Sequence, residues 1–191
     1  MKRTQLIFCV ETNRKSDTDF LYIKSTIDRF YDYQNGHVQI KPVYLGGKGR
    51  YSTSSNARKI NELIRQFSAG SKNAESHVFL CLDYDKYDSD PADRKFFVDA
   101  ENYCRTKDNY HLIWFCRDVE DVYLGHQISN TQKTGAAKRF MARKQIVTVE
   151  ANKLRATQYR QHYSNICTVL DQFLPNRQEL GVMRDESMSH I

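Results

Sequence analysis

Short apolar runs alternate with amphipathic patterns along the first two thirds of the chain. Four runs are apolar throughout and bounded by polar or turn residues, as is typical of buried strands; they lie at residues 5–11, 37–45, 77–83 and 110–118. Residues 17–33 place five large side chains on one helical face, namely Phe20, Ile23, Ile27, Phe30 and Tyr31. Such strands alternating with helices predict a mostly parallel sheet covered on both faces. The predicted fold class is therefore α/β, with a four-stranded sheet.

Local signals place the ends of the remaining helices. A second helix begins at Ser54 or Ser55, either of which can act as its N-cap. A third helix spans residues 91–106 with Asp90 as its N-cap, and a short fourth helix follows the fourth strand. Because Pro42 lies inside the second predicted strand, that strand is expected at an edge of the sheet or at a bulge.

Positive charge is concentrated after Thr131. The formal net charge of the 191 residues is +6, but residues 131–165 alone hold eight basic residues and one acid. The strand signal also disappears in this part, apart from a weak one at 145–150. We therefore predict a first domain at 1–128 and a basic helical C-terminal extension at 129–191 that packs on it.

The basic residues have two interpretations. Lysine and arginine can hold a nucleic-acid backbone by displacing counterions, with Tyr159 and Tyr163 available to stack on bases. Alternatively, the charges after Thr131 are the solvated face of an amphipathic helix. The candidate nucleic-acid contacts are Lys48, Arg50, Lys86, Lys138, Arg139, Arg143, Lys144, Lys153, Arg155 and Arg160.

Composition excludes several classes of protein. With 40% hydrophobic and 27% charged residues and only 3 prolines, the chain fits a globular protein better than a disordered one. No apolar run approaches the roughly 18 residues of a membrane span, and the first residues lack the pattern of a signal peptide. We therefore expect a cytoplasmic protein without membrane contact. The five cysteines are scattered and form no C-x-x-C pair, which predicts buried packing and not disulfides or a zinc site.

Acidic residues follow three of the predicted strands. Glu11 ends the first strand, Asp83 ends the third, and the fourth is followed by Asp118, Glu120 and Asp121. Because an open α/β sheet binds ligands at the carboxyl ends of its strands, these acids are expected at one edge. A divalent cation between them would make their mutual repulsion tolerable. Carboxylates without a histidine or cysteine cluster favour Mg²⁺ or Mn²⁺, and such ions serve phosphoryl chemistry.

Each of these signals also has a plainer interpretation. The acids of the D-Y-D stretch at 83–85 could cap a helix or line a solvated turn, and Asp17 and Asp19 could be first-turn acids favoured by the helix dipole. The glycine-rich stretch at 46–50 is not a P-loop, because no Lys-Ser or Lys-Thr follows. It is a surface turn or a phosphate contact. Among the histidines, only His126 is placed where it could contribute.

Together these residues resemble the Toprim fold of metal-dependent nucleases, primases and topoisomerases. That family has a glutamate at the end of its first strand and a D-x-D at the end of a later one, as at Glu11 and 83–85 here. The chain is most similar to the small OLD-like and RloB-like bacterial defence proteins, which often read E-G-x-S-D-x-x-F-L after the first strand. The stretch E-T-N-R-K-S-D-T-D-F-L keeps Glu11, Ser16, Asp17, Phe20 and Leu21. Thr12 replaces the glycine, and two extra residues precede Ser16.

The resemblance covers about residues 6–124 and includes G-G-K-G-R-Y-S and R-D-V-E-D-V-Y-L, the second of which nominates Glu120. It implies a Toprim-like nuclease that hydrolyses phosphodiester bonds of nucleic acid with Mg²⁺ or Mn²⁺, in anti-phage defence. The implied catalytic residues are Glu11, Asp83, Asp85 and Glu120. The implied metal ligands are Glu11, Asp17, Asp83, Asp85 and Glu120, with Asp19 as a weaker candidate. Lys48 or Lys86 would neutralise charge in the transition state.

Other functions stay open at this point. The chain could be a Toprim-like nucleic-acid-binding subunit of a defence complex that does not cut, in which case Asp83 would be dispensable. Nucleotide-sugar transferases also use D-x-D with Mn²⁺, although the small size and positive charge argue against one. A phosphatase or receiver-like domain would use Asp83 as nucleophile, but its later Ser/Thr and Lys cannot be placed. A partner ATPase, a homodimer, and DNA, RNA or tRNA as substrate are all compatible with the sequence.

Overall fold

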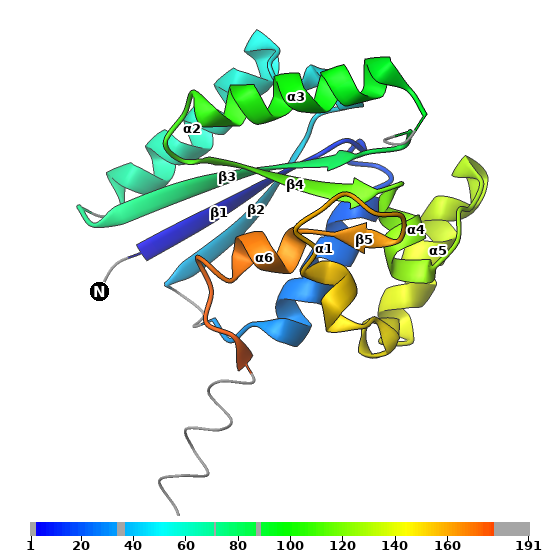
Figure 1. The fold of residues 1–191 in the computed structure, drawn as a ribbon. Coiled ribbons are helices and arrows are strands. Elements are labelled where there is room, and N and C mark those ends of the chain that lie inside the picture. The colour runs from blue at the N-terminus through cyan, green and yellow to red at the C-terminus, as the bar shows by residue number, and fades with distance from the viewer. Residues whose placement is uncertain (1–2, 34–36, 71, 87–88, 178–191) are drawn as a thin grey trace, which may run out of the picture.

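The computed structural model describes residues 3–33, 37–70, 72–86 and 89–177, and its strands form a five-stranded sheet in the order β2-β1-β3-β4-β5 (Figure 1). The strands are β1 (Arg3–Val10), β2 (Val38–Tyr44), β3 (Ala74–Asp83), β4 (Tyr110–Cys116) and β5 (Tyr163–Ser164). The first four are parallel, and β5 is antiparallel to β4. The α/β class and the mostly parallel sheet are thus confirmed. The predicted number of four strands is wrong by one, because two residues are too few to give a hydrophobic pattern.

Helices cover both faces of this sheet. One face carries α2 (Ser54–Ala69) and α3 (Pro91–Arg105); the other carries α1 (Thr18–Phe30), α4 (Val119–Leu124), α5 (Asn130–Ala142) and α6 (Ile166–Leu170) (Figure 1). The structure also describes the 3₁₀ helices η1 (Lys48–Arg50), η2 (Gln145–Thr148) and η3 (Ala151–Leu154). Strands covered in this way must be apolar on both sides, which explains the unbroken apolar runs in the sequence.

Each face has its own apolar core. Ile7 of β1 packs with Ile60 of α2 and Phe97 of α3. On the other face, Phe8 of β1 packs with Tyr22 of α1. Because successive strand residues point to opposite faces, β1 contributes to both cores. The central strands β1 and β3 pack against both cores, so the residues that follow these strands are held in fixed positions.

Helix capping follows the sequence only in part. Asp90 caps α3 as predicted, and its carboxylate accepts a hydrogen bond from the Ala92 amide at 2.9 Å. The N-cap of α2 is Thr53, however, and not Ser54 or Ser55. All three hydroxyl residues are suitable caps. Thr53 takes the position because its backbone is still extended when the helix begins.

The chain after residue 129 shares the core beneath α1. Phe140, Leu154, Ile166 and Leu170 are buried with the apolar side chains of β1 on that face. A helix at the start of this part is confirmed as α5. The weak strand signal at 145–150 was misleading, because these residues include η2. The boundary between 1–128 and 129–191 stays a prediction.

Other expectations from the sequence can be compared with the structure directly. β2, which contains Pro42, is an edge strand as predicted. All five cysteines are buried, and within the described residues none forms a disulfide. No helix in the described part of the chain is both long enough and apolar enough to cross a membrane.

Candidate functional site

Glu11 and Asp83 lie together at the carboxyl ends of the neighbouring strands β1 and β3. The Asp83 amide donates a hydrogen bond to Glu11 Oε1 at 2.8 Å. Asp83 Oδ1 in turn accepts a hydrogen bond from the Val119 amide, at the start of α4, at 3.1 Å. Parallel register explains this proximity, since Val10 at the end of β1 pairs with Cys81 of β3. The sequence prediction brought these two acids to one edge, and the structure places them there.

Asp19, from the first turn of α1, is the third acid of this edge. Its side chain is buried, and its two carboxylate oxygens accept hydrogen bonds from the Thr12 amide and from Thr18 Oγ1, both at 3.2 Å. Asp17, which the sequence favoured over Asp19 as a metal ligand, instead accepts a hydrogen bond from Tyr44 OH. Asp17 has a left-handed backbone with φ of 48°. This turn at the start of α1 gives Asp19 the buried position.

The acids that follow β4 have separate tasks. Asp118 caps α4, because its Oδ1 accepts a hydrogen bond from the Asp121 amide at 2.7 Å. Glu120 is fully buried, and its Oε2 lies 2.7 Å from the ammonium of Lys133 in α5. The same ammonium lies 3.5 Å from Asp118 Oδ2. Together Glu11, Asp19, Asp83, Asp118 and Glu120 form what we call the acid cluster.

Asp121 points elsewhere. Its Oδ2 accepts a hydrogen bond from the Arg117 amide at 3.2 Å and lies 3.1 Å from Nδ1 of His162. His126, which the sequence favoured, is exposed, and its ring contacts the Leu124 carbonyl. His162 had no signal in the sequence, because its place depends on the packing of β5 beside β4.

Four carboxyls of the acid cluster have a raised pKa. The pKa of Glu11 is raised to about 8, chiefly by burial; the Asp83 amide and the charge of Lys48 oppose the rise, and the charges of Asp19 and Asp85 add to it. Burial, followed by the charges of Glu11 and Asp19, also holds the pKa of Asp83 well above its usual range. Burial likewise raises the pKa of the Asp19 and Glu120 carboxyls. In the absence of a cation, Glu11 therefore holds its proton near neutral pH.

The second acid of the D-Y-D stretch is separate from this cluster. Asp85 is exposed, and its Oδ2 lies 3.1 Å from the Lys48 ammonium. Lys48 also contacts Asp93 of α3 at 2.6 Å. The glycine-rich stretch brings Lys48 here: Gly47 has φ of 139° and its amide donates to the Glu11 carbonyl at 2.8 Å. A backbone of this kind favours glycine. Lys48 is therefore an ion-paired neighbour of the site.

The residues fit a hard cation in their chemistry. The cluster offers only carboxylate oxygens, the ligands that Mg²⁺ and Mn²⁺ prefer. Glu120 Oε1 is also buried without a hydrogen-bond partner among the described residues. In the described part of the chain, however, no three Asp, Glu, His or Cys side chains are grouped closely enough to hold a metal ion. Several carboxylate oxygens are instead engaged by backbone amides.

The predicted nucleic-acid contacts fall into two groups. Most are exposed, namely Arg50, Lys86, Lys138, Arg139, Arg143, Lys144 and Arg160. Lys48, Lys153 and Arg155 are partly buried. Arg155 is ion-paired with Asp171 at 3.1 Å and lies over the Phe30 ring, so a structural role accounts for it.

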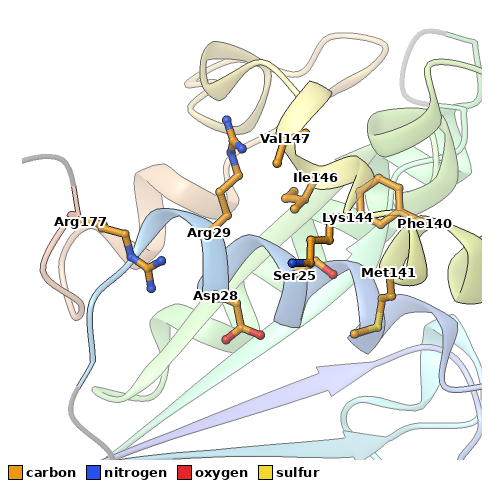
Figure 2. Close-up of a pocket in the computed structure, with 9 residues that line it drawn as sticks. All are labelled: Ser25, Asp28, Arg29, Phe140, Met141, Lys144, Ile146, Val147 and Arg177. Atoms are coloured by element: carbon orange, nitrogen blue, oxygen red, sulfur yellow. The ribbon is translucent and has the colours of Figure 1, made fainter.

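A groove of about 570 Å³ lies beside α1, and none of its lining residues belongs to the acid cluster (Figure 2). Its lining combines Arg29, Lys144 and Arg177 with the acid Asp28 and with apolar side chains such as Phe140. Phe140 belongs to α5, the helix that carries Lys133 at its other end. The groove therefore lies toward the opposite end of α5 from the acid cluster.

A comparison with protein-family models, curated proteins and solved structures finds no match to this chain. The function must therefore be inferred from the fold and from the geometry of the acid cluster.

Proposed function

We propose that the protein is a nucleic-acid phosphodiesterase that depends on Mg²⁺ or Mn²⁺ and has its reaction centre at Glu11, Asp19 and Asp83. The observation that carries the proposal is the hydrogen bond of 2.8 Å from the Asp83 amide to Glu11 Oε1, which holds acids of two strands together although burial and repulsion raise the pKa of both. Such crowding costs free energy unless a cation shares the carboxylates. The Toprim-like motifs in the sequence support the same conclusion.

Each acid has a distinct part in this proposal. Asp19 and Asp83 would hold the cation, with their orientations fixed by the Thr12 and Val119 amides. When bound, the ion neutralises the charge that develops on the phosphate. Glu11 would take the proton of the attacking water, because a cation bound beside it would displace the proton that it otherwise holds near neutral pH.

The position of α5 supports nucleic acid as the substrate. Lys133, near the start of this helix, reaches the acid cluster. Lys138 and Arg139 are exposed further along the same helix, roughly 8 Å away at 1.5 Å per residue. Arg143 and Lys144 follow at its end. A polyanion held by these bases would extend toward the acids, which is the arrangement that a phosphodiesterase needs.

The test is cleavage of labelled single-stranded DNA, duplex DNA and tRNA by the purified protein with Mg²⁺, Mn²⁺ or EDTA. Asp83→Asn and Glu11→Gln keep size and hydrogen bonding but remove charge. Each is expected to slow metal-dependent cleavage by at least about 100-fold. The control is Asp99→Asn, which alters an exposed acid paired with Lys95 and should cleave as the wild type does.

Two outcomes would decide against the proposal. Equal cleavage by Asp83→Asn would place the reaction elsewhere. Binding of nucleic acid without cleavage, under every metal condition, would favour the second candidate, a nucleic-acid-binding subunit without catalytic activity. One observation favours that candidate: the described acids do not group into a set of three metal ligands.

A further inference from the structure

Lys133 lies beside Asp118 and Glu120, the two acids of the cluster that follow β4. Its ammonium lies 2.7 Å from Glu120 Oε2 and 3.5 Å from Asp118 Oδ2. The side chain of Glu120 is 0% exposed and that of Lys133 is 23% exposed. The charge of Lys133 also interacts with Asp83, the acid at the end of β3. A cation supplied by the chain itself thus lies among acids of two different strand ends.

Lys133 leaves the buried glutamate incompletely bonded. Glu120 Oε1 is buried and, within the described residues, has no hydrogen-bond partner, although Oε2 is 2.7 Å from the ammonium. A buried carboxylate oxygen without a partner costs free energy. This observation is independent of the clustering of acids. It indicates that Glu120 can accept more coordination than the single ammonium supplies.

We propose that Lys133 is a built-in counter-cation that takes the place of a second divalent ion, so that the protein binds one Mg²⁺ or Mn²⁺ at Asp19 and Asp83, beside Glu11, and none at Glu120. The site of the one ion depends on the proposed function; the role of Lys133 at Glu120 does not.

The reason is electrostatic. Two-metal phosphodiesterases place two ions about 3.5 to 4 Å apart, and each ion needs carboxylates of its own. Here the carboxylates that could serve a second ion, Asp118 and Glu120, are already paired with the single ammonium of Lys133. A divalent ion at that position would also be repelled by the ammonium at short range. Removing the positive charge of Lys133 should therefore open a second position for an ion.

The test compares Lys133→Met with Lys138→Met, which removes an exposed lysine from the same helix. Free Mn²⁺ is titrated by electron paramagnetic resonance, and thermal unfolding is followed with EDTA and with saturating Mn²⁺. We expect one ion per chain in the wild type and in Lys138→Met, and two in Lys133→Met. With EDTA, Lys133→Met should melt at least about 5 °C below the wild type, because Glu120 loses its partner. Mn²⁺ should recover more than half of that loss.

A double variant, Lys133→Met with Glu120→Gln, guards against simple misfolding. It removes both charges, so it should regain the melting temperature in EDTA and return to one bound ion. The proposal is overturned if Lys133→Met binds no additional ion and Mn²⁺ does not recover its melting temperature. If the wild type binds one ion and cuts nucleic acid while this happens, only the role of Lys133 fails. If Lys133→Met gains an ion but the wild type cuts nothing, the nuclease proposal fails and the role of Lys133 stands.

Discussion

At the amino ends of the parallel strands buried polar groups are hydrogen-bonded to one another, whereas at the carboxyl ends acidic groups repel one another. Near the amino ends, Gln5 is buried but donates to Gln39 Oε1 at 2.7 Å and accepts from Ser76 Oγ at 3.0 Å. His77 and His111 there pack against the ring of Phe173. At the carboxyl ends, the acid cluster combines burial with mutual repulsion, and the pKa of several of its carboxyls is raised.

This difference separates stability from function. Neutral groups that satisfy one another, such as Gln5 and Ser76, favour the folded state. Several acids held close together, although burial and mutual repulsion raise their pKa, are characteristic of sites that bind or react, where stability is given up. The carboxyl ends are therefore the part of this sheet on which function should depend, and the amino ends are the part that can be altered without loss of activity.

The largest expected contrast is a fall in stability as the carboxyl ends lose protons. In EDTA, Glu11 has a folded pKa of about 8, against 4.5 ordinarily, so the folded state binds more protons between these values. This stabilisation is complete below pH 4.5 and is lost as the pH rises through 8, by up to about 5 kcal/mol. Urea unfolding at several pH values measures it. Glu11→Gln should flatten the slope, and an unchanged slope would contradict the account of the acid cluster.

The amino ends should show the opposite slope. Burial, and then the charge of His77, lower the pKa of His111 from 6.5 to about 4, so the unfolded state binds more protons between these values. Stability is complete above pH 6.5 and is lost as the pH falls toward 4, by up to about 3 kcal/mol. His111→Phe should remove this loss, whereas His126→Phe, at an exposed ring, should keep it. The same loss in both variants would mean that another group is responsible.

The smallest contrast is between one substitution at the carboxyl ends and one at the amino ends. Above its ordinary pKa of 3.8 the Asp83 carboxyl disfavours the folded state, because its pKa is raised there. Asp83→Asn removes this carboxyl but keeps an oxygen for the Val119 amide, so it should raise the free energy of unfolding by about 1 to 2 kcal/mol in EDTA. Gln5→Leu leaves Gln39 and Ser76 without their partner and should lower it by about 1 to 2 kcal/mol. Denaturant unfolding gives both values. A destabilised Asp83→Asn would show that its charge serves the fold.

Much of this arrangement was readable in the sequence, because it follows from periodicity and strand direction. Apolar runs predicted β1 to β4, and parallel strands necessarily bring Glu11 and Asp83 to one edge. What depends on tertiary detail was not readable. The left-handed turn at Asp17 decides that Asp19 is the buried acid, and only the packing of α5 against the acid cluster brings in Lys133. A basic residue on a polar helix face gives no sign of its partner.

The most direct test of the central claim, that the carboxyl ends are built for a divalent cation, is a Mn²⁺ titration of the wild type beside the double variant Glu11→Gln with Asp83→Asn. Both substitutions preserve volume and hydrogen-bonding shape. We expect the wild type to bind Mn²⁺ and the double variant to bind it at least about 100-fold more weakly, because two carboxylates are gone. Equal affinity in the two proteins, or no binding by the wild type, would contradict the claim.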